Sequence, residues 1–370
     1  MSGAPAVTAP TVRPGGGGPT ARRWTGVAVA GGGALLVLLS PLVGSVAIPA
    51  GEVAAILLHG LTGGALAADP CPSTVSARLC GAYTEIVWDS RVPEILLAVI
   101  AGAALGLSGG TLQGIFRNPL ADPYLLGLSA GGTLGASLLF SLGIGAAEAN
   151  LALPLFAFAG ATLTGLLLLA ASRLLGGSVE TLLLTGVALA SLLSAMLSVL
   201  LLYNPQGGLQ VDFWLLGGLG DASWTVDGIA FGGVLAAASL LLLYGRELNL
   251  LQLGTEVAQS LGVATGSVRH RTLLLASLAT AMAVAFTGII GFVGLVSPHI
   301  VRRLVGSDYR KVLPASALVG GLFLLAANDL AVGLFPAIVL PVGIFTSFAG
   351  APFFLYLLYR RRRDAAGDAA

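Results

Sequence analysis

The sequence predicts an all-α protein that crosses a membrane many times, and its composition is the main reason. Of its 370 residues, 56% belong to the hydrophobic set AVILMFWYC and only 9% are Asp, Glu, Lys or Arg. A soluble domain carries about 25% charged residues, which keep its surface hydrated. The mean hydropathy of +0.93 also excludes a disordered chain, because disorder requires low hydrophobicity and high charge. The 53 glycines suit helices that approach one another closely in a bilayer.

Ten apolar runs are suitable membrane spans, at roughly 20 residues for a full crossing. They cover residues 24–49, 92–114, 123–143, 151–172, 182–203, 226–245, 271–290, 291–305, 312–333 and 338–358. The long run 271–305 is divided into two spans because only an even number of crossings gathers the basic residues on one side of the membrane.

The charge distribution then sets the orientation. With ten spans, 16 of the 18 basic residues fall on the side that carries both termini. They are Arg13, Arg22, Arg23, Arg117, Arg173, Arg246, Arg269, Arg271, Arg302, Arg303, Arg310, Lys311 and Arg360 to Arg363. Cytoplasmic loops carry an excess of Lys and Arg. Both termini are therefore expected in the cytoplasm.

The membrane domain is expected to cover residues 24–359, between two cytoplasmic tails. Residues 1–23 are rich in Gly, Pro and Ala and are expected to be disordered, and residues 360–370 form a basic tail. The apolar run that starts at Trp24 is longer than the about 7–15 residues of a signal-peptide core. A retained first helix is therefore favoured over a cleaved signal peptide.

One long outer loop, about residues 47–91, contains both cysteines of the chain, Cys71 and Cys80. Thiols outside the cytoplasm oxidise readily. A disulfide that closes this loop is therefore predicted, and two free thiols are the alternative.

The chain lacks the residues for its own catalysis. Its one lysine, Lys311, precedes Val312, whereas a phosphate-binding GxxxxGK[ST] loop needs Ser or Thr there. Three scattered histidines (His59, His270 and His299) and two cysteines are too few for a metal site. We therefore expect no enzyme activity and no cofactor, and any ATP-driven role requires another subunit.

The segment from Gln113 to Gly127 is the densest polar segment at a span end. Two X-Pro steps push Asn118 and Asp122 out of helical geometry, so the backbone breaks at a membrane edge. Either this segment is functional, or it is a tight turn in which Asp122 caps the next helix.

Residues 248–265 form a second unusual segment, too polar to span and too apolar for a free loop. Leu251, Leu253, Val257 and Leu261 predict a short amphipathic helix that ends at Gly262. Such a helix outside the membrane needs a partner or the bilayer surface, unless it folds back on its own bundle.

Two further segments are rich in Gly and Pro, residues 287–303 and 340–356. His299 is expected to be a buried structural residue rather than a ligand. Asp329 near the end of a span is either functional or simply solvated at the interface. Trp214 and Trp224 indicate a short interfacial helix at the outer mouth.

Together these segments resemble the FecCD family of ABC importer permeases for iron–siderophore, haem and cobalamin, from about Arg91 to Tyr356. The matching motif residues are Gln113, Arg117, Asn118, Pro119, Asp122 and Pro123, then Gly254, Ala258, Leu261 and Gly262, then Pro298 and His299, and finally Pro341 and Gly343. The family has ten spans per subunit, which agrees with the charge distribution.

The resemblance implies a non-catalytic subunit in a bacterial cell membrane. It implies a pair of permeases, most often a homodimer, with two ATPase subunits on the cytoplasmic face and an extracytoplasmic binding protein outside. An iron–siderophore complex is the expected cargo, with haem or cobalamin as alternatives.

The resemblance also assigns roles to particular segments. Gly254, Ala258, Leu261 and Gly262 would couple to the ATPase, and Ser178, Val179, Glu180 and Thr181 would lie at the cytoplasmic gate. Arg91, Glu94 and Asp329 would face the binding protein. The family commonly has a second arginine where this chain has Glu94, which indicates either an unusual binding protein or docking through Arg91 and local shape.

Two other functions are alternatives to this one. An ion-coupled secondary transporter often has broken helices at the midplane, but here the breaks lie near membrane edges. An intramembrane enzyme needs a nucleophile and base or paired metal ligands at depth, and the scattered histidines argue against it.

Overall fold

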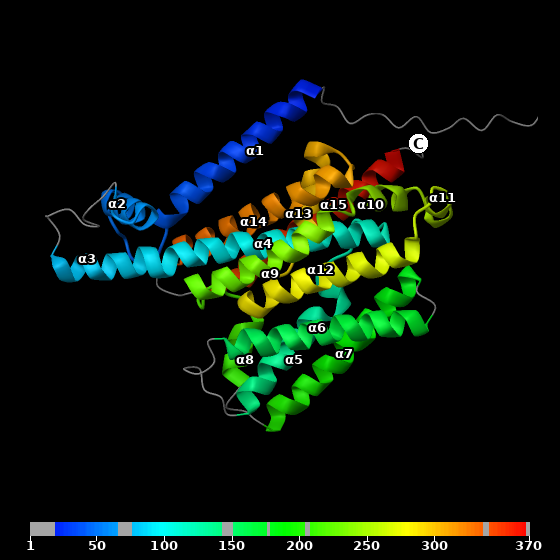
Figure 1. Ribbon diagram of the computed structural model, residues 1–370, viewed down its shortest axis with the longest axis horizontal. Helices are drawn as coiled ribbons and strands as arrows, with labels where there is room; N and C mark the ends of the chain where they lie inside the picture. The colour runs from blue at the N-terminus through cyan, green and yellow to red at the C-terminus, as the bar shows by residue number, and fades with distance from the viewer. Residues whose placement is uncertain are drawn as a thin grey trace, which may run out of the picture.

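The computed structural model describes residues 19–65, 76–142, 151–175, 178–203, 208–335 and 340–367, and all regular structure in those residues is helical (Figure 1). Six helical segments are long and apolar enough to cross a membrane: Arg78–Phe116, Ala152–Ala171, Glu180–Tyr203, Trp224–Leu242, Thr265–Thr287 and Tyr309–Leu334. Shorter apolar helices cover Ala28–Leu42, Ala50–Thr62, Leu128–Ser141 and Val342–Tyr356. The predicted all-helical polytopic class is confirmed.

The helices follow one another along the chain as α1 (Pro19–Leu39), α2 (Ala50–Thr62), α3 (Ala77–Thr84), α4 (Val92–Phe116), α5 (Leu128–Ser141), α6 (Ala152–Leu174), α7 (Val179–Tyr203), α8 (Gly208–Leu215), α9 (Trp224–Leu242), α10 (Gly245–Gln252), α11 (Thr255–Ser260), α12 (Thr265–Thr287), α13 (Val293–Val305), α14 (Tyr309–Leu334) and α15 (Val342–Gly367). Short 3₁₀ turns cover Ser40–Leu42 and Pro123–Leu126, and a π-helical segment covers Glu85–Arg91.

The N-terminal quarter differs most from the sequence-based expectation. Helix α1 begins at Pro19, inside the expected disordered tail, and ends at Leu39, ten residues before the end of the expected span. The residues expected to form a long outer loop instead contain α2, α3 and the π-helical segment. Helices α3 and α4 lie in line through that segment and project beyond the bundle (Figure 1).

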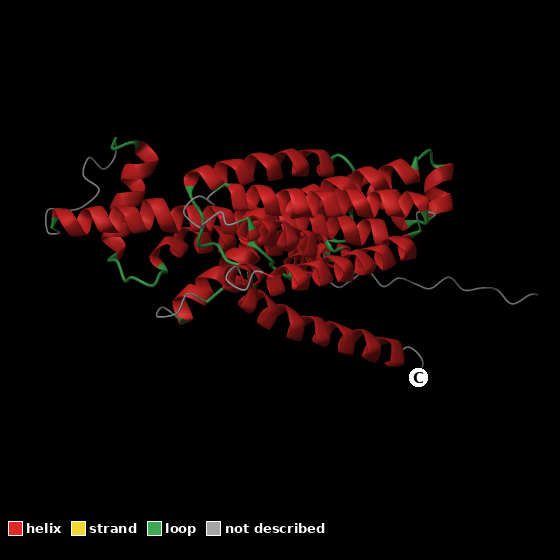
Figure 2. Cartoon of the chain, turned by 90° about the horizontal axis from the view of Figure 1, so that it is seen from below, coloured by secondary structure: helices red, strands yellow, loops and turns green. Residues whose placement is uncertain are grey.

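Helix α4 is the centre of the bundle and packs against α9, α12, α13 and α14. Its glycines allow the close approach. A Cβ on Gly109 would collide with the backbone of Gly294 in α13, and a Cβ on Gly102 would collide with the backbone of Gly320 in α14. Helix α7, by contrast, lies at the edge of the molecule with few buried residues. Figure 2 shows the C-terminal helix leaving the bundle.

The predicted division of residues 271–305 into two helices is confirmed. Helix α12 ends at Thr287, and α13 begins at Val293. Gly288 and Phe292 both have positive φ angles, +65° and +67°, and reverse the chain between them. A Cβ on Gly288 would collide with the carbonyl of Trp214, so glycine is required there for packing as well as for conformation.

Candidate functional site

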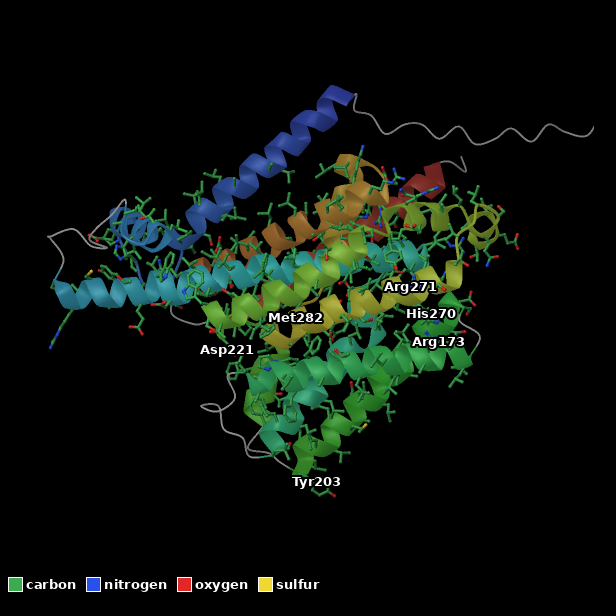
Figure 3. The ribbon with its side chains drawn as sticks, in the orientation of Figure 1. Arg173, Tyr203, Asp221, His270, Arg271 and Met282 are labelled. Carbon is green, nitrogen blue, oxygen red and sulfur yellow. The ribbon has the colours of Figure 1, made fainter. Side chains whose placement is uncertain are left out.

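Helices α10 and α11 lie at one end of the bundle, opposite α2 and α3 (Figure 1). Arg173, His270 and Arg271 lie at this same end (Figure 3), which is the end that the charge distribution assigns to the cytoplasm and is hereafter called the cytoplasmic end. The end formed by α2 and α3 is called the outer end.

The expected amphipathic helix at the cytoplasmic end is two helices rather than one. Gly254, with φ +111°, separates α10 from α11, and Gly262, with φ +83°, follows the end of α11. Ala258 is buried, whereas the side chains of Leu253, Val257 and Leu261 are 60%, 45% and 57% exposed. These three exposed side chains are called the α10–α11 patch.

Hydrogen bonds fix α10 and α11 to the membrane helices. Gln252 Nε2 donates to the carbonyl of Gly114 at the end of α4 (2.9 Å). Arg269 of α12 donates to Thr255 Oγ1 (2.8 Å), and Gln259 Nε2 donates to Thr265 Oγ1 (3.1 Å). Movement of the patch is therefore transmitted directly to α4 and α12.

A buried polar network lies behind this face. Gln113 is buried, and its Nε2 donates to the carbonyl of Gly294 in α13 (3.4 Å). Its Oε1 accepts from Arg302, whose Nη2 donates to the hydroxyl of Tyr309 (3.1 Å). The Arg302 guanidinium also lies 5.6 Å from the ring centre of Tyr309, within cation–π range. Gln113 thus ties α4 to α13 and, through Arg302, to α14.

A second network joins α10 to the start of α14. Asn249 Nδ2 donates to Asp308 Oδ1 (2.7 Å), and the backbone N–H of Tyr309 donates to Asn249 Oδ1 (2.8 Å). The hydrogen bond from Asn249 is the main reason that the pKa of the Asp308 carboxyl lies below its usual range. Asp308 also caps α14 by accepting from the backbone N–H of Arg310.

The chain breaks after α4, in the segment where the two X-Pro steps predict a break. Arg117 ends the helix with φ +50°, which is rare outside glycine. Asn118 Oδ1 accepts from the N–H of Leu120 (3.0 Å), and Asp122 Oδ1 accepts from the N–H of Tyr124 (2.8 Å). The predicted capping by Asp122 is confirmed, although it caps the 3₁₀ turn from Pro123 rather than α5 itself.

The Asp122 carboxyl is an unusual acid. Burial raises its pKa to about 6, even though the hydrogen bond from Tyr124 favours the charged form. It also lines the cavity described next. Its charge therefore changes near neutral pH.

A cavity of about 970 Å³ extends from the break after α4 to α15. Its lining includes Leu120, Asp122, Tyr124, Leu216, Phe292, Leu295, Gly343, Ser347 and Phe348. Most of these side chains are apolar, and Phe348 is 75% exposed. Gly343 is required at the rim, since a Cβ there would collide with the carbonyl of Leu216; Pro341 lies immediately before α15.

Pro298 and His299 lie within α13. Pro298 is buried, and the His299 ring packs edge-on against Phe353 of α15, with 5.9 Å between ring centres. No group of three or more His, Cys, Asp or Glu side chains in the described residues could hold a metal ion. These contacts give His299 a packing role between two helices.

The predicted gate segment lies at the start of α7. The backbone N–H of Thr181 donates to Ser178 Oγ (3.1 Å), and the two hydroxyl oxygens are 2.8 Å apart. Ser178 therefore caps α7, and Glu180 is exposed beside it; the side chain of Val179 lies outside the described residues. The gate role of these four residues stays a prediction.

At the outer end, the three predicted docking residues turn inward. Arg91 is 6% exposed and donates to the carbonyls of Pro41 (2.9 Å) and Val46. Glu94 Oε1 accepts from Asn328 Nδ2 (3.1 Å), and Asp329 Oδ1 accepts from Ser40 Oγ (2.7 Å). A small cavity of about 90 Å³ lies among them.

The polar atoms of Arg91, Glu94 and Asp329 are thus bonded within the chain. These bonds join the turn after α1 to the π-helical segment and to α14, and α4 to α14. The sequence carried no signal for this arrangement, because the partners are far apart along the chain. The docking role of these residues stays a prediction. Little of the Arg91 side chain is exposed for contact with a binding protein. The predicted disulfide also stays a prediction, since Cys71 lies outside the described residues and only Cys80, in α3, lies within them.

The comparisons with known proteins agree with the motifs. Residues 33–360 match the model of the FecCD transport family. The chain is 43% identical over 281 residues to the cobalamin import system permease protein BtuC of Halobacterium salinarum, covering 75% of this chain and 74% of the relative. It is 40% identical over 283 residues to the Fe(3+) dicitrate transport system permease protein FecD of Escherichia coli, covering 75% and 86%.

A solved structure gives the same result for the fold. It is an inward-facing conformation of an ABC transporter assigned to the metal-chelate type, with a TM-score of 0.71 and 30% identity. The match covers 90% of this chain and 99% of the other. The ion-coupled and enzymatic alternatives are thereby set aside.

Permeases of this kind carry no cofactor, are multi-pass proteins of the cell membrane, and work with ATPase subunits and a binding protein. The chain has similar identity to relatives with different cargoes, so its cargo class is iron chelates, hemin or cobalamin. The chain belongs to the FecCD transport family, and it is a non-catalytic permease subunit of an ABC importer.

Proposed function

We propose that this permease imports iron–siderophore complexes and that two copies of it form the translocation path. In this proposal ten helices cross the membrane: the six long ones together with α1, α5, α13 and α15. Both termini lie in the cytoplasm. The strong bias of basic residues toward that side supports this orientation.

The observation that carries the proposal is the cavity of about 970 Å³ beside α15. It is an open groove in the single chain, with exposed apolar side chains such as Phe348 and Leu216 along it. A second copy facing this groove would close it into a passage. Helix α7, whose apolar surface is largely exposed, would supply further contact area. In a bilayer, close packing of the two copies would hold them together, because exposed apolar surface alone does not drive association there.

The lining also supports a bulky cargo. A mostly apolar wall makes few strong contacts with a metal that is wrapped in an organic ligand, and weak contacts allow release. The ferric dicitrate relative supports iron as the metal. The cobalamin relative keeps cobalamin as an alternative cargo, and haem is a third.

Coupling is assigned to the cytoplasmic end. Gly254, Ala258, Leu261 and Gly262 would contact the ATPase through the α10–α11 patch, and Ser178 to Thr181 would gate the path. Support comes from the exposed patch and from its hydrogen bonds to α4 and α12.

The test is uptake by proteoliposomes that contain this permease, its ATPase and its binding protein. Radiolabelled ferric siderophore, haem and cobalamin are supplied in parallel, with an ATPase variant that cannot hydrolyse ATP as the negative control. ATP-dependent uptake of the ferric siderophore alone supports the proposal. Preferential uptake of haem or cobalamin would show that the proposed cargo is wrong. An active complex with a single copy of the permease would refute the shared path.

The coupling assignment has a matched pair of variants. A Cβ on either Gly262 or Gly266 meets nothing within 4 Å. Because Gly262 has a φ of +83°, where any side chain is strained, Gly262→Ala is the control for that strain. Gly262→Arg is expected to abolish stimulated ATP hydrolysis, because it enters the contact with the ATPase. Gly266→Arg is expected to retain it. Equal activity of the two variants would place coupling elsewhere.

A further inference from the structure

Two arginines converge on the junction between α10 and α11. Arg117, at the end of α4, is exposed, and a Cβ built on Gly254 would lie 4.0 Å from its Nη1. Arg269, from the second turn of α12, donates from Nη2 to Thr255 Oγ1 (2.8 Å). Both guanidinium groups therefore lie beside Gly254 and Thr255, although the two arginines are 152 positions apart in the sequence.

Arg269 carries its charge in an unfavourable place. Its partial burial and the like charge of the Arg117 guanidinium both disfavour the charged form of Arg269. The Nε of Arg269 is buried and has no hydrogen-bond partner. Buried donors and like charges in proximity both cost free energy unless an acceptor is supplied. An anion placed between the two guanidinium groups would offset both costs.

The backbone holds Arg117 in an unusual conformation. Its φ of +50° lies in the left-handed region, which is unfavourable for a residue other than glycine. Asn118 and Pro119 follow directly, so the chain leaves α4 at a fixed angle. The Arg117 side chain is therefore presented at the cytoplasmic end by a rigid turn rather than by a free loop.

The surroundings indicate what kind of anion fits. The α10–α11 patch, with exposed Leu253, Val257 and Leu261, is next to the two arginines. It lies beyond the ends of the membrane helices, where a protein surface can cover apolar and charged groups together. A protein carboxylate also matches the bidentate geometry of a guanidinium. An anionic lipid headgroup would satisfy the charge but would not cover the patch.

We propose that Arg117 and Arg269 form a two-arginine site for a carboxylate of the ATPase subunit, adjacent to the α10–α11 patch. The proposal rests on the proposed function, because it requires the ATPase to dock at this end. It adds the chemistry of the contact: an acidic side chain seated between α4, α11 and α12. Since Arg269 also holds Thr255, occupation of the site would bind the patch to α12 more firmly.

The test is the affinity of the ATPase for this permease in nanodiscs of neutral lipid, at several salt concentrations. Arg117→Glu and Arg269→Glu are each expected to weaken binding about tenfold or more, since a truncated or reversed close charge pair costs that much or more. They should also reduce the salt dependence. Arg271→Glu, an exposed arginine on the same helix at the same end (Figure 3), is the control, with an expected change of less than about twofold.

Arg117→Gln and Arg269→Gln remove the charge without reversing it and keep a polar side chain, and correct folding is checked by the thermal unfolding temperature. Both glutamine variants are expected to weaken binding of the ATPase, as the glutamate variants do, while the thermal unfolding temperature stays unchanged. An acidic ATPase residue whose change to lysine restores binding to Arg117→Glu would identify the partner and support the proposal.

Binding that is equal in wild type, Arg117→Glu and Arg269→Glu would overturn the proposal while leaving the proposed function intact. Weakening by these variants that appears only in nanodiscs with anionic lipid would also overturn it, in favour of a lipid headgroup. Failure of the wild-type permease to bind any ATPase would instead refute the proposed function on which it rests.

Discussion

The two ends of the bundle use polar residues in opposite ways. At the outer end, Arg91, Glu94 and Asp329 turn inward and bond to groups of the same chain. At the cytoplasmic end, the uncharged side chains of Gln113 and Asn249 make internal bonds, and their partners are the charged side chains of Arg302 and Asp308. Charged side chains such as Arg117 and Arg271 stay exposed there.

This difference teaches that a charged residue near a span end is not by itself a docking residue. The outer charges add polar bonds among the turn after α1, the π-helical segment, α4 and α14, of which α4 and α14 also pack closely together. The cytoplasmic polar network performs that task behind the surface and leaves the surface free. We therefore expect outer-end variants to act mainly on stability, and cytoplasmic surface variants to act mainly on partners.

The largest expected effect comes from Arg91→Met. It removes the donor to the carbonyls of Pro41 and Val46, and Gly44 makes room for this guanidinium, since a Cβ there would collide with it. Leaving buried carbonyls unpaired costs about 1–3 kcal/mol each, so we expect a loss of about 3 kcal/mol in the free energy of unfolding. Thermal unfolding in detergent measures it.

Arg78→Met is the control, because Arg78 is an exposed arginine at the same end, and it should leave unfolding unchanged. If Arg91→Met unfolds like wild type but binds the binding protein more weakly, Arg91 would be a docking residue after all. The contrast between the two ends would then fail at this position.

A smaller loss is expected from Gln113→Leu at the cytoplasmic end. The leucine cannot accept from Arg302 or donate to Gly294, and one buried polar partner lost costs about 1–3 kcal/mol. Thr111→Val is the matched control in the same helix, because the Thr111 hydroxyl bonds only to the carbonyl of Leu107, within α4. Both variants are compared by chemical or thermal unfolding.

A result in which Gln113→Leu and Thr111→Val are equally stable would show that the Gln113 network is not needed to hold α4 against α13. Loss of ATPase binding in Gln113→Leu without loss of stability would mean that Gln113 acts on partner binding rather than on stability.

Local features of this chain could be predicted from the sequence, and contacts between distant residues could not. The division of residues 271–305 into two helices was predicted from the distribution of the basic residues. The cap at Asp122 was predicted at the backbone break that the two X-Pro steps cause. Both depend on residues within a short stretch. The inward turn of Glu94 depends on Asn328, 234 positions away, and that of Asp329 on Ser40, 289 positions away.

The segment from 248 to 262 lies between these cases. Apolar periodicity correctly indicated helix and an exposed face, but the periodicity continues across Gly254 and so predicted one helix. The φ of +111° at Gly254 ends α10, and the bonds from Gln252 to α4 and from Arg269 to α11 hold the two helices at this break. Those bonds are tertiary, so no local pattern could place the break.

The smallest expected effect is a change in pH dependence with Asp122→Asn. The pKa of Asp122 is raised by burial to about 6 from an ordinary value of 3.8. The folded protein therefore binds this proton more tightly than the unfolded chain does. Stability from this group rises as the pH falls from about 7 toward 4, and the penalty of the buried charge is fully present above about 6.

Asparagine keeps an oxygen that can accept from Tyr124 N–H and carries no charge, so Asp122→Asn should be at least as stable as wild type at pH 7 and should lose this part of the pH dependence. Asp308→Asn gives the opposite sign: the lowered pKa of Asp308 stabilises the folded state at neutral pH, and that stabilisation is lost as the pH falls through its folded-state value. Unfolding temperatures between pH 5 and 7.5, about the range of Asp122 titration, test Asp122→Asn, and measurements extended below pH 3.8 test Asp308→Asn. Equal slopes for wild type and Asp122→Asn would mean that the Asp122 carboxylate is hydrated when folded, and that the cytoplasmic end of the large cavity is wet.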